Sequence, residues 1–270
     1  MFTVVRRAIV VLDCTGEAFG AGLWVEGESS ISIRGLTPRR ALKELPEHIA
    51  YLLQNAGLKY TDIVAVGVSR GPGSFTGVRL GVTLAKTIAQ VACCSIAAFD
   101  TLELIAHSHA ASLNEVPGAI AVALDARRKE VYCGVFSPRS DNEPLLFRRM
   151  AWEPGSHEKW PEAPRPDGLF VEPLLETGVR SPEEFKESLD QIKELRVSVG
   201  PGFAAYPELL GPSYRGIVLS KQENSNLCLD SLCRLTLRSY QHETLMDALS
   251  LDPCYHRRAD IQVAREEKKP

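Results

Sequence analysis

The chain has 270 residues, of which 44% are hydrophobic, and its 31 Lys and Arg against 34 Asp and Glu give a formal net charge of −3. This composition supports a packed core in one large domain or two smaller ones, and it excludes a global positive field that attracts nucleic acid or an acidic membrane. No segment approaches the roughly 20 apolar residues of a membrane span, and the first residues lack a signal-peptide pattern, so we expect a cytoplasmic protein without membrane contact.

The seven cysteines are an odd number, scattered from Cys14 to Cys254. This distribution favours reduced thiols over a disulfide framework. Cys228 and Cys233 are the best zinc-finger candidates, but no second pair at finger spacing completes four ligands. We therefore expect them to be core cysteines.

An internal repeat is the most informative feature of the sequence. Two elements recur in one order: an apolar run that ends in Asp and returns as a second strand, and a later strand that leads into Gly-Pro-Gly. The copies lie at Val10–Trp24 and Val122–Phe136 for the hairpin, and at 66–73 and 197–202 for the second element. Chance similarity of short hairpins is the alternative, but the shared order favours two related α/β lobes.

Between the two elements of the first lobe, a helix is predicted from Thr37 to about Gln54. Thr37 is a suitable N-cap, Pro38 suits the first helical position, and Gly57 ends the helix. Pro46 should kink it. The predicted core stripe consists of Leu42, Leu45, Ile49, Leu52, Leu53 and Ala56.

The predicted strand Ile63–Ser69 leads into Gly71-Pro72-Gly73-Ser74-Phe75-Thr76-Gly77 and a helical run to about Ala92. The glycines permit a tight turn, Ser74 can cap the helix, and a helix start of this kind can hold an anion. Because the Gly-Lys-Ser/Thr ending is missing, this is not a Walker-type phosphate loop. Capping without a ligand is therefore the alternative to phosphate binding.

The helix that follows Ser74 is apolar nearly all round. One apolar face can cover a sheet, and the other must be buried within the same lobe or against a partner. We therefore hypothesise a helix-to-helix protein interface, with burial inside the lobe as the alternative. The stripes are Val78, Val82, Ala85 and Ala89 on one side, and Leu80, Leu84 and Ile88 on the other.

Four segments of the chain resemble the TsaB (YeaZ) family, whose members are paralogues of the TsaD/Kae-type subunit. The long run Ser69–Arg79 is close to the family's signature, and the other three are Leu12–Thr15, Leu124–Tyr132 and Pro253–Arg257. The chain departs from the family pattern in two places. Cys14-Thr15-Gly16 follows Asp13 where the family has Thr-Ser, and His256 replaces the Leu of a Tyr-Leu-Arg sequence.

The resemblance implies an α/β, actin-like, duplicated ribonuclease-H-like fold with two lobes, of the sugar-kinase and heat-shock ATPase type. Residues 1–110 would form the first lobe, completed by a C-terminal helix at 240–260. Residues 111–239 would form a smaller second lobe, with an insertion around 137–196.

The resemblance also implies an accessory role. Proteins of this family pair with TsaD, which carries the chemistry that places threonylcarbamoyl on adenosine beside the anticodon, and a TsaE ATPase joins them. The implied partners are therefore a TsaD-like subunit, a TsaE-like ATPase, tRNA only through the complex, and a second copy of the chain in isolation. The pairing surface would be formed by first-lobe helix residues, namely His48, Tyr51, Leu52, Phe75, Val78, Arg79, Val82 and Lys86.

The main rival is an Mg-nucleotide-binding enzyme, because kinases and chaperone ATPases of this architecture bring one Asp from each lobe to Mg-nucleotide. The candidate nucleotide or phosphate residues are Asp13, Thr15, Ser74, Thr76 and Asp125. Each Asp can instead bond turn amides. We expect no cofactor, with weak ATP or ADP and Mg at a partner interface as the alternative.

A metallopeptidase is the third class considered, and the sequence opposes it. It contains neither a His-Glu-x-x-His helix nor a Gly-x-Ser-x-Gly elbow. TsaD-like enzymes hold a metal with two histidines four apart on the first-lobe helix, where this chain offers His48 alone. We therefore predict no catalytic residue and no bound metal, and the basic C-terminal stretch from Arg257 to Lys269 is either a solvated tail or a tRNA contact.

Overall fold

The structure, a computed structural model, describes residues 6–26, 29–112, 118–140, 148–151, 169–211, 217–219 and 228–256. Within these ranges, no helix has both the length and the apolar composition needed to cross a membrane. The basic C-terminal stretch from Arg257 to Lys269 lies outside the described residues.

The first lobe is built on a six-stranded sheet with the order β5-β4-β1-β2-β3-β8. Strands β1 to β3 are antiparallel neighbours, and β4, β5 and β8 join in parallel. Its elements in chain order are β1 (Ala8–Asp13), β2 (Phe19–Val25), β3 (Ser29–Gly35), α1 (Ala41–Asn55), β4 (Ile63–Ser69), α2 (Phe75–Ala92), β5 (Ser95–Phe99) and α3 (Thr101–Ser112), with β8 (Arg148–Ala151) added from later in the chain.

The second lobe repeats this succession around a sheet with the order β11-β10-β6-β7-β9. Its elements are β6 (Ala119–Arg127), β7 (Glu130–Ser140), β9 (Leu169–Arg180), α4 (Pro182–Asp190), β10 (Leu195–Val199), α5 (Gly202–Ala205), β11 (Ile217–Leu219) and α6 (Leu229–Gln241). Both lobes therefore have the same order of elements: three strands, then a helix, a strand, a helix, a strand and a helix. The fold is the actin-like, duplicated ribonuclease-H-like fold, and the predicted hairpins are confirmed.

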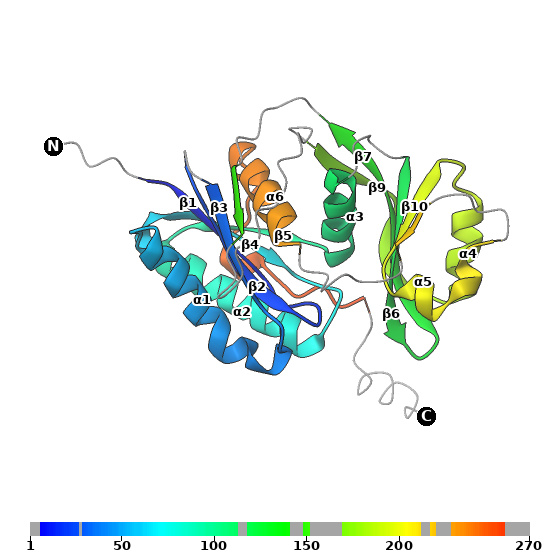
Figure 1. Ribbon diagram of the computed structural model, residues 1–270, viewed down its shortest axis with the longest axis horizontal. Coiled ribbons are helices and arrows are strands. Elements are labelled where there is room, and N and C mark those ends of the chain that lie inside the picture. The colour runs from blue at the N-terminus through cyan, green and yellow to red at the C-terminus, as the bar shows by residue number, and fades with distance from the viewer. Residues whose placement is uncertain are drawn as a thin grey trace.

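Helices and sheets alternate in layers across the molecule (Figure 1). Helices α1 and α2 cover the outer face of the first sheet, and α4 and α5 cover the outer face of the second. The two remaining helices are exchanged: α3 packs on β6, β7 and β9 of the second sheet, while α6 packs on β1, β2 and β4 of the first. The last helix of each lobe thus covers the other lobe's sheet.

A C-terminal helix completes the first lobe, but its predicted position was wrong. The helix is α6 at Leu229–Gln241, whereas the described part of 240–260 contains only the end of α6 and a 3₁₀ turn at Ala248–Ser250. The apolar spacing of α6, with Leu229, Leu232 and Leu235 among its buried residues, is the helical signal that identifies its true position.

The central strands are buried on both faces, with successive side chains in different cores. On β1, Val10 and Leu12 pack under α1 and α2, while Ile9 and Val11 face the layer of α3 and α6. In the second lobe, Ile120 belongs to the same middle core. The lobes therefore share one apolar layer instead of meeting only through a linker.

The predicted insertion at 137–196 also needs correction. Strand β9 and helix α4 lie in this stretch as the second-lobe counterparts of β3 and α1. Residues Ser181 and Glu184 form a reciprocal capping box that fixes the start of α4. The additional chain is therefore confined to the connection between β7 and β9, from which β8 joins the first sheet beside β3.

Helix α1 ends at Asn55, close to its predicted end, but it begins at Ala41 and not directly after Thr37 as predicted. It follows a 3₁₀ turn at Pro38–Arg40, and Thr37 makes no side-chain capping bond within the described structure. Leu42 was predicted to lie in the core, yet it is 74% exposed. It occupies the first turn of the helix, where the core stripe starts instead from Ala41.

Candidate functional site

The glycine-rich loop before α2 packs directly on the turn that follows β1. The Ser74 amide donates to the Thr15 carbonyl at 2.8 Å. A Cβ on Gly73 would collide with this same carbonyl, and one on Gly77 would collide with the carbonyl of Cys14. The glycines therefore permit close backbone contact between two protein segments.

The start of α2 is capped by the chain itself. The Ser74 hydroxyl accepts from the Gly77 amide at 3.3 Å, as predicted, and the Ser74 carbonyl accepts from the Val78 amide at 2.8 Å. Thr76 is exposed in the first turn. Since the Ser74 and Gly77 amides are already bonded, these contacts favour capping without a ligand over the phosphate-binding alternative.

The two repeated aspartates make the same turn bond in their two hairpins. Asp13 Oδ1 accepts from the Thr15 amide at 2.9 Å and from the Thr15 hydroxyl at 2.8 Å. Asp125 Oδ1 accepts from the Arg127 amide at 2.8 Å. Burial raises the pKa of Asp13 to about 6, although the two bonds from Thr15 oppose the shift. Turn bonding accounts for both carboxylates without a nucleotide.

Three of the predicted pairing residues lie in the core of their own lobe. Leu52, Val78 and Val82 are buried between the first sheet and its outer helices. Their inclusion in a contact surface was wrong, because helical periodicity identifies an apolar stripe but not which body covers it.

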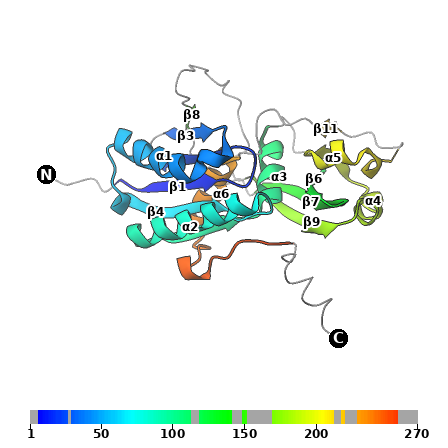
Figure 2. The same cartoon turned by 90° about the horizontal axis from the view of Figure 1, so that it is seen from below.

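The second apolar stripe of α2 is less exposed than predicted. Leu80 and Leu84 are half-buried against the outer core. The chain's own C-terminal segment covers part of this side: Met246 pairs with Ile96 of β5, the 3₁₀ turn at Ala248–Ser250 contacts α2, and the segment runs along the helix (Figure 2). The surplus apolar surface is therefore partly covered within the subunit.

An aromatic–arginine cluster, formed by Phe75, Arg79 and Tyr255, lies at the start of α2. The Arg79 guanidinium stacks over the Phe75 ring at 3.9 Å, and Arg79 Nε donates to the Tyr255 hydroxyl at 2.9 Å. The Phe75 and Tyr255 rings are 5.5 Å apart, and these residues are 52% and 45% exposed. Aromatic and arginine side chains held in this way are the types that dominate binding energy at protein interfaces.

The other predicted surface residues lie along the outer helices. Tyr51 is exposed on α1, and Lys86 is half-buried on α2. His48 is half-buried and stacks on Phe19 with ring centroids 5.7 Å apart, and burial lowers the pKa of its imidazole. Tyr255 was not among the predicted pairing residues, although it belongs to the C-terminal segment that carries the family resemblance.

Comparisons with known proteins agree with this architecture. Residues 28–142 match the family model described as TsaD, tRNA N6-adenosine threonylcarbamoyltransferase. The chain is 28% identical to the tRNA threonylcarbamoyladenosine biosynthesis protein TsaB of Haemophilus influenzae, over 92% of this chain and 93% of that protein. It is 29% identical to the protein of the same name from Escherichia coli, over 80% and 79%. The chain is thus similar to proteins of the TsaB (YeaZ) family along most of its length.

The structural comparison agrees with the family at the level of the fold. YeaZ from Pseudomonas aeruginosa superposes with a TM-score of 0.66, over 92% of this chain and 99% of that chain, at 22% identity. This chain therefore shares its overall fold with the solved YeaZ structure.

Proposed function

We propose that the chain is an accessory subunit of tRNA threonylcarbamoyladenosine biosynthesis, acting as a non-catalytic scaffold. It pairs with a TsaD-like transferase, a TsaE-like ATPase joins the pair, and tRNA is reached only through the complex. Similarity to the TsaB (YeaZ) family and the names of the Haemophilus influenzae and Escherichia coli relatives support the pathway.

The aromatic–arginine cluster is the observation that carries the pairing proposal. It lies at one end of α2, while exposed Tyr51 lies on neighbouring α1. A TsaD-like paralogue has a related fold and can present equivalent helices, so the two chains can pack about a pseudo-twofold axis. A second copy of this chain can use the same surface in isolation.

The internal contacts of the first hairpin support a role without catalysis. Asp13 is buried and bonded to Thr15, and the Ser74 amide is bonded to the Thr15 carbonyl. A Mg-nucleotide held by Asp13 Oδ1 and the Ser74 amide would have to replace these bonds. Titration calorimetry of the isolated chain with Mg-ATP should therefore show no submillimolar binding.

Reconstitution with purified TsaD-like and TsaE-like subunits tests the proposal. Formation of threonylcarbamoyladenosine on tRNA should require this chain and should persist with Asp13→Asn. The double variant Phe75→Ala/Arg79→Ala should lower product formation at least tenfold at limiting subunit concentration, as expected for a loss of about 2 kcal/mol in binding. Leu174→Ala removes an exposed apolar side chain from the second lobe and is the matched control. Equal product formation without this chain would contradict the proposal.

A further inference from the structure

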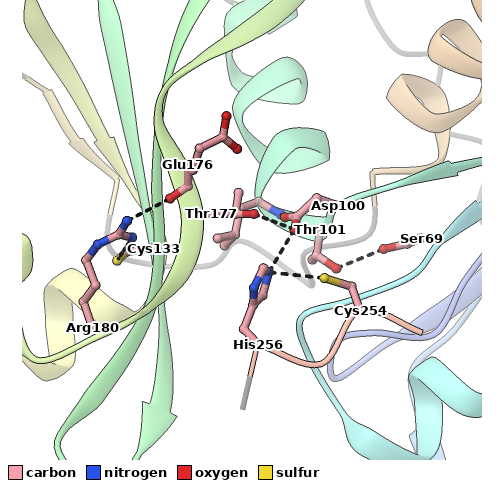
Figure 3. Close-up of polar contacts among 10 residues, drawn as sticks. Ser69, Asp100, Thr101, Cys133, Glu176, Thr177, Arg180, Cys254 and His256 are labelled. Carbon is pink, nitrogen blue, oxygen red and sulfur yellow. Dashed lines mark hydrogen bonds and ion pairs between the residues drawn. The ribbon is translucent and has the colours of Figure 1, made fainter. Parts of the chain in front are cut away.

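Three side chains from distant parts of the sequence converge where the two lobes meet (Figure 3). Asp100 lies between β5 and α3, and Cys254 and His256 lie on the C-terminal segment. His256 Nε2 is 3.2 Å from Asp100 Oδ2 and 3.4 Å from Cys254 Sγ. The three ligand atoms lie within 4.8 Å of one another, and the described ranges contain no other such group of three His, Cys, Asp or Glu side chains.

The geometry differs from that of a catalytic Cys-His-Asp relay. In a relay, the nucleophile and the carboxylate bond to different imidazole nitrogens, so that a proton can pass through the ring. Here the thiol and the carboxylate both approach Nε2. Because a neutral imidazole nitrogen carries at most one proton, Nε2 alone cannot relay a proton between the thiol and the carboxylate. Donor atoms that converge on one point are instead the pattern of a metal ligand set.

The spacing of the donor atoms fits zinc. Tetrahedral bonds of about 2.0–2.1 Å to nitrogen, 2.0–2.2 Å to oxygen and 2.3 Å to sulfur place nitrogen and oxygen about 3.4 Å apart, and nitrogen and sulfur about 3.6 Å apart. The observed separations of 3.2 and 3.4 Å are slightly shorter. Thiolate and imidazole together also favour Zn²⁺ over Mg²⁺ or Ca²⁺, which prefer oxygen ligands.

The surrounding contacts hold the ligands in place. Asp100 Oδ1 accepts from the Leu102 amide at 2.8 Å, and the Thr177 hydroxyl of β9 donates to Asp100 Oδ2 at 3.1 Å. The Cys254 amide donates to the Arg70 carbonyl at 2.8 Å. The side chains of His256 and Asp100 are only 15% and 11% exposed. Such supporting bonds orient the ligands of protein metal sites and raise their affinity.

We propose that Asp100, Cys254 and His256 form a Zn²⁺ site with a solvent molecule as the fourth ligand. The ion holds the C-terminal segment against the β5–α3 junction and thereby fixes the backbone on both sides of Tyr255. This proposal replaces the expectation of no bound metal, which considered only ligands close together in sequence. It concerns metal binding by the chain alone and does not depend on the proposed function.

Metal titration of the full-length, metal-free chain tests the site. Co²⁺ should bind one ion per chain and produce the near-ultraviolet absorption of a cobalt–thiolate bond, and Zn²⁺ should displace it. Cys254→Ser and His256→Leu should each lower the affinity at least tenfold, because even supporting residues contribute about 10- to 100-fold. Cys93→Ser removes an exposed thiol elsewhere and should behave like the unaltered chain.

Circular dichroism of each variant establishes that it is folded, and both ligand substitutions lie outside the sheets and helices. Failure of the unaltered chain to bind Zn²⁺ more tightly than about 0.1 mM, which is only about 5.5 kcal/mol of binding free energy, would overturn the proposal. So would unchanged affinity in both Cys254→Ser and His256→Leu, since the metal would then bind elsewhere.

Discussion

The two lobes contain the same Gly-Pro-Gly element but use it to start very different helices. In the first lobe, Gly71-Pro72-Gly73 precedes α2, which has 18 residues. In the second lobe, Gly200-Pro201-Gly202 leads into α5, which has four. In both lobes a glycine permits close approach to another backbone, to Thr15 in the first and to Ala123 in the second.

This difference separates the features that both lobes need for folding from the surface that the proposed pairing would use. Close backbone packing at the glycines and an Asp-bonded turn occur in both lobes, so they belong to the common fold. Among the residues that the structure describes, the long α2 with its exposed Phe75 and Arg79 occurs only in the first. We therefore expect changes at the shared features to affect stability, and changes at the aromatic–arginine cluster to affect assembly.

The largest loss of stability is expected for Gly77→Ala. Alanine normally favours a helix by about 1 kcal/mol over glycine, but here its Cβ would collide with the Cys14 carbonyl. We expect a loss of about 3 kcal/mol in the free energy of unfolding, measured by urea denaturation. Gly57→Ala is the control: it has φ of +65° but no atom within 4 Å of the added Cβ, so about 1–2 kcal/mol of backbone strain should remain. Equal losses would contradict close packing at the loop.

Asp13→Asn is expected to have the next largest effect on stability, and this effect depends on pH. The pKa of Asp13 is raised to about 6 by burial, above about 3.9 in the unfolded chain. The folded state therefore binds the proton more tightly, and this carboxyl lowers stability as pH rises from about 4 to about 6. From pH 4 to pH 7.5, the unfolding free energy of Asp13→Asn should rise by about 1–3 kcal/mol relative to the unaltered chain.

Urea denaturation at both pH values measures this effect. Asp125→Asn provides the matched control, because Asp125 makes the same turn bond with a partly exposed side chain. Parallel pH profiles for Asp13→Asn and the unaltered chain would contradict the assignment of Asp13 as a buried turn residue.

Tyr255→Phe should have the smallest effect on folding. It removes only the hydroxyl that accepts from Arg79 at an exposed position, so the free energy of unfolding should change by less than about 0.5 kcal/mol. Affinity for a TsaD-like subunit should nevertheless fall about three- to tenfold, or about 0.7–1.4 kcal/mol. Unchanged affinity together with a lower free energy of unfolding would contradict this prediction.

Much of the fold was predictable because its signals are local. Strand Ile63–Ser69 and the end of α2 at Ala92 were predicted at the observed residues, and the repeated hairpins identified the duplication. Helix α4 was missed although the capping box of Ser181 and Glu184 marks its start. The exchange of α3 and α6 between sheets could not be read from local spacing, because it depends on contacts between the lobes.

The surface was harder to predict than the fold. The sequence shows that α2 is apolar on two sides, but not that the C-terminal segment covers part of the second side. Because side-chain exposure depends on these contacts between distant segments, the sequence does not show that Val78 is buried and Tyr255 exposed. Asp100 and His256 are 156 residues apart, so no motif spacing connects them.

Affinity for a purified TsaD-like subunit, measured by titration calorimetry, tests most directly whether the first lobe is the pairing lobe. Phe75→Ala/Arg79→Ala should weaken binding about 30-fold or more, or about 2 kcal/mol, while Leu174→Ala on the second lobe should leave it unchanged. Unchanged binding by the double variant, or a comparable loss with Leu174→Ala, would contradict pairing through the aromatic–arginine cluster.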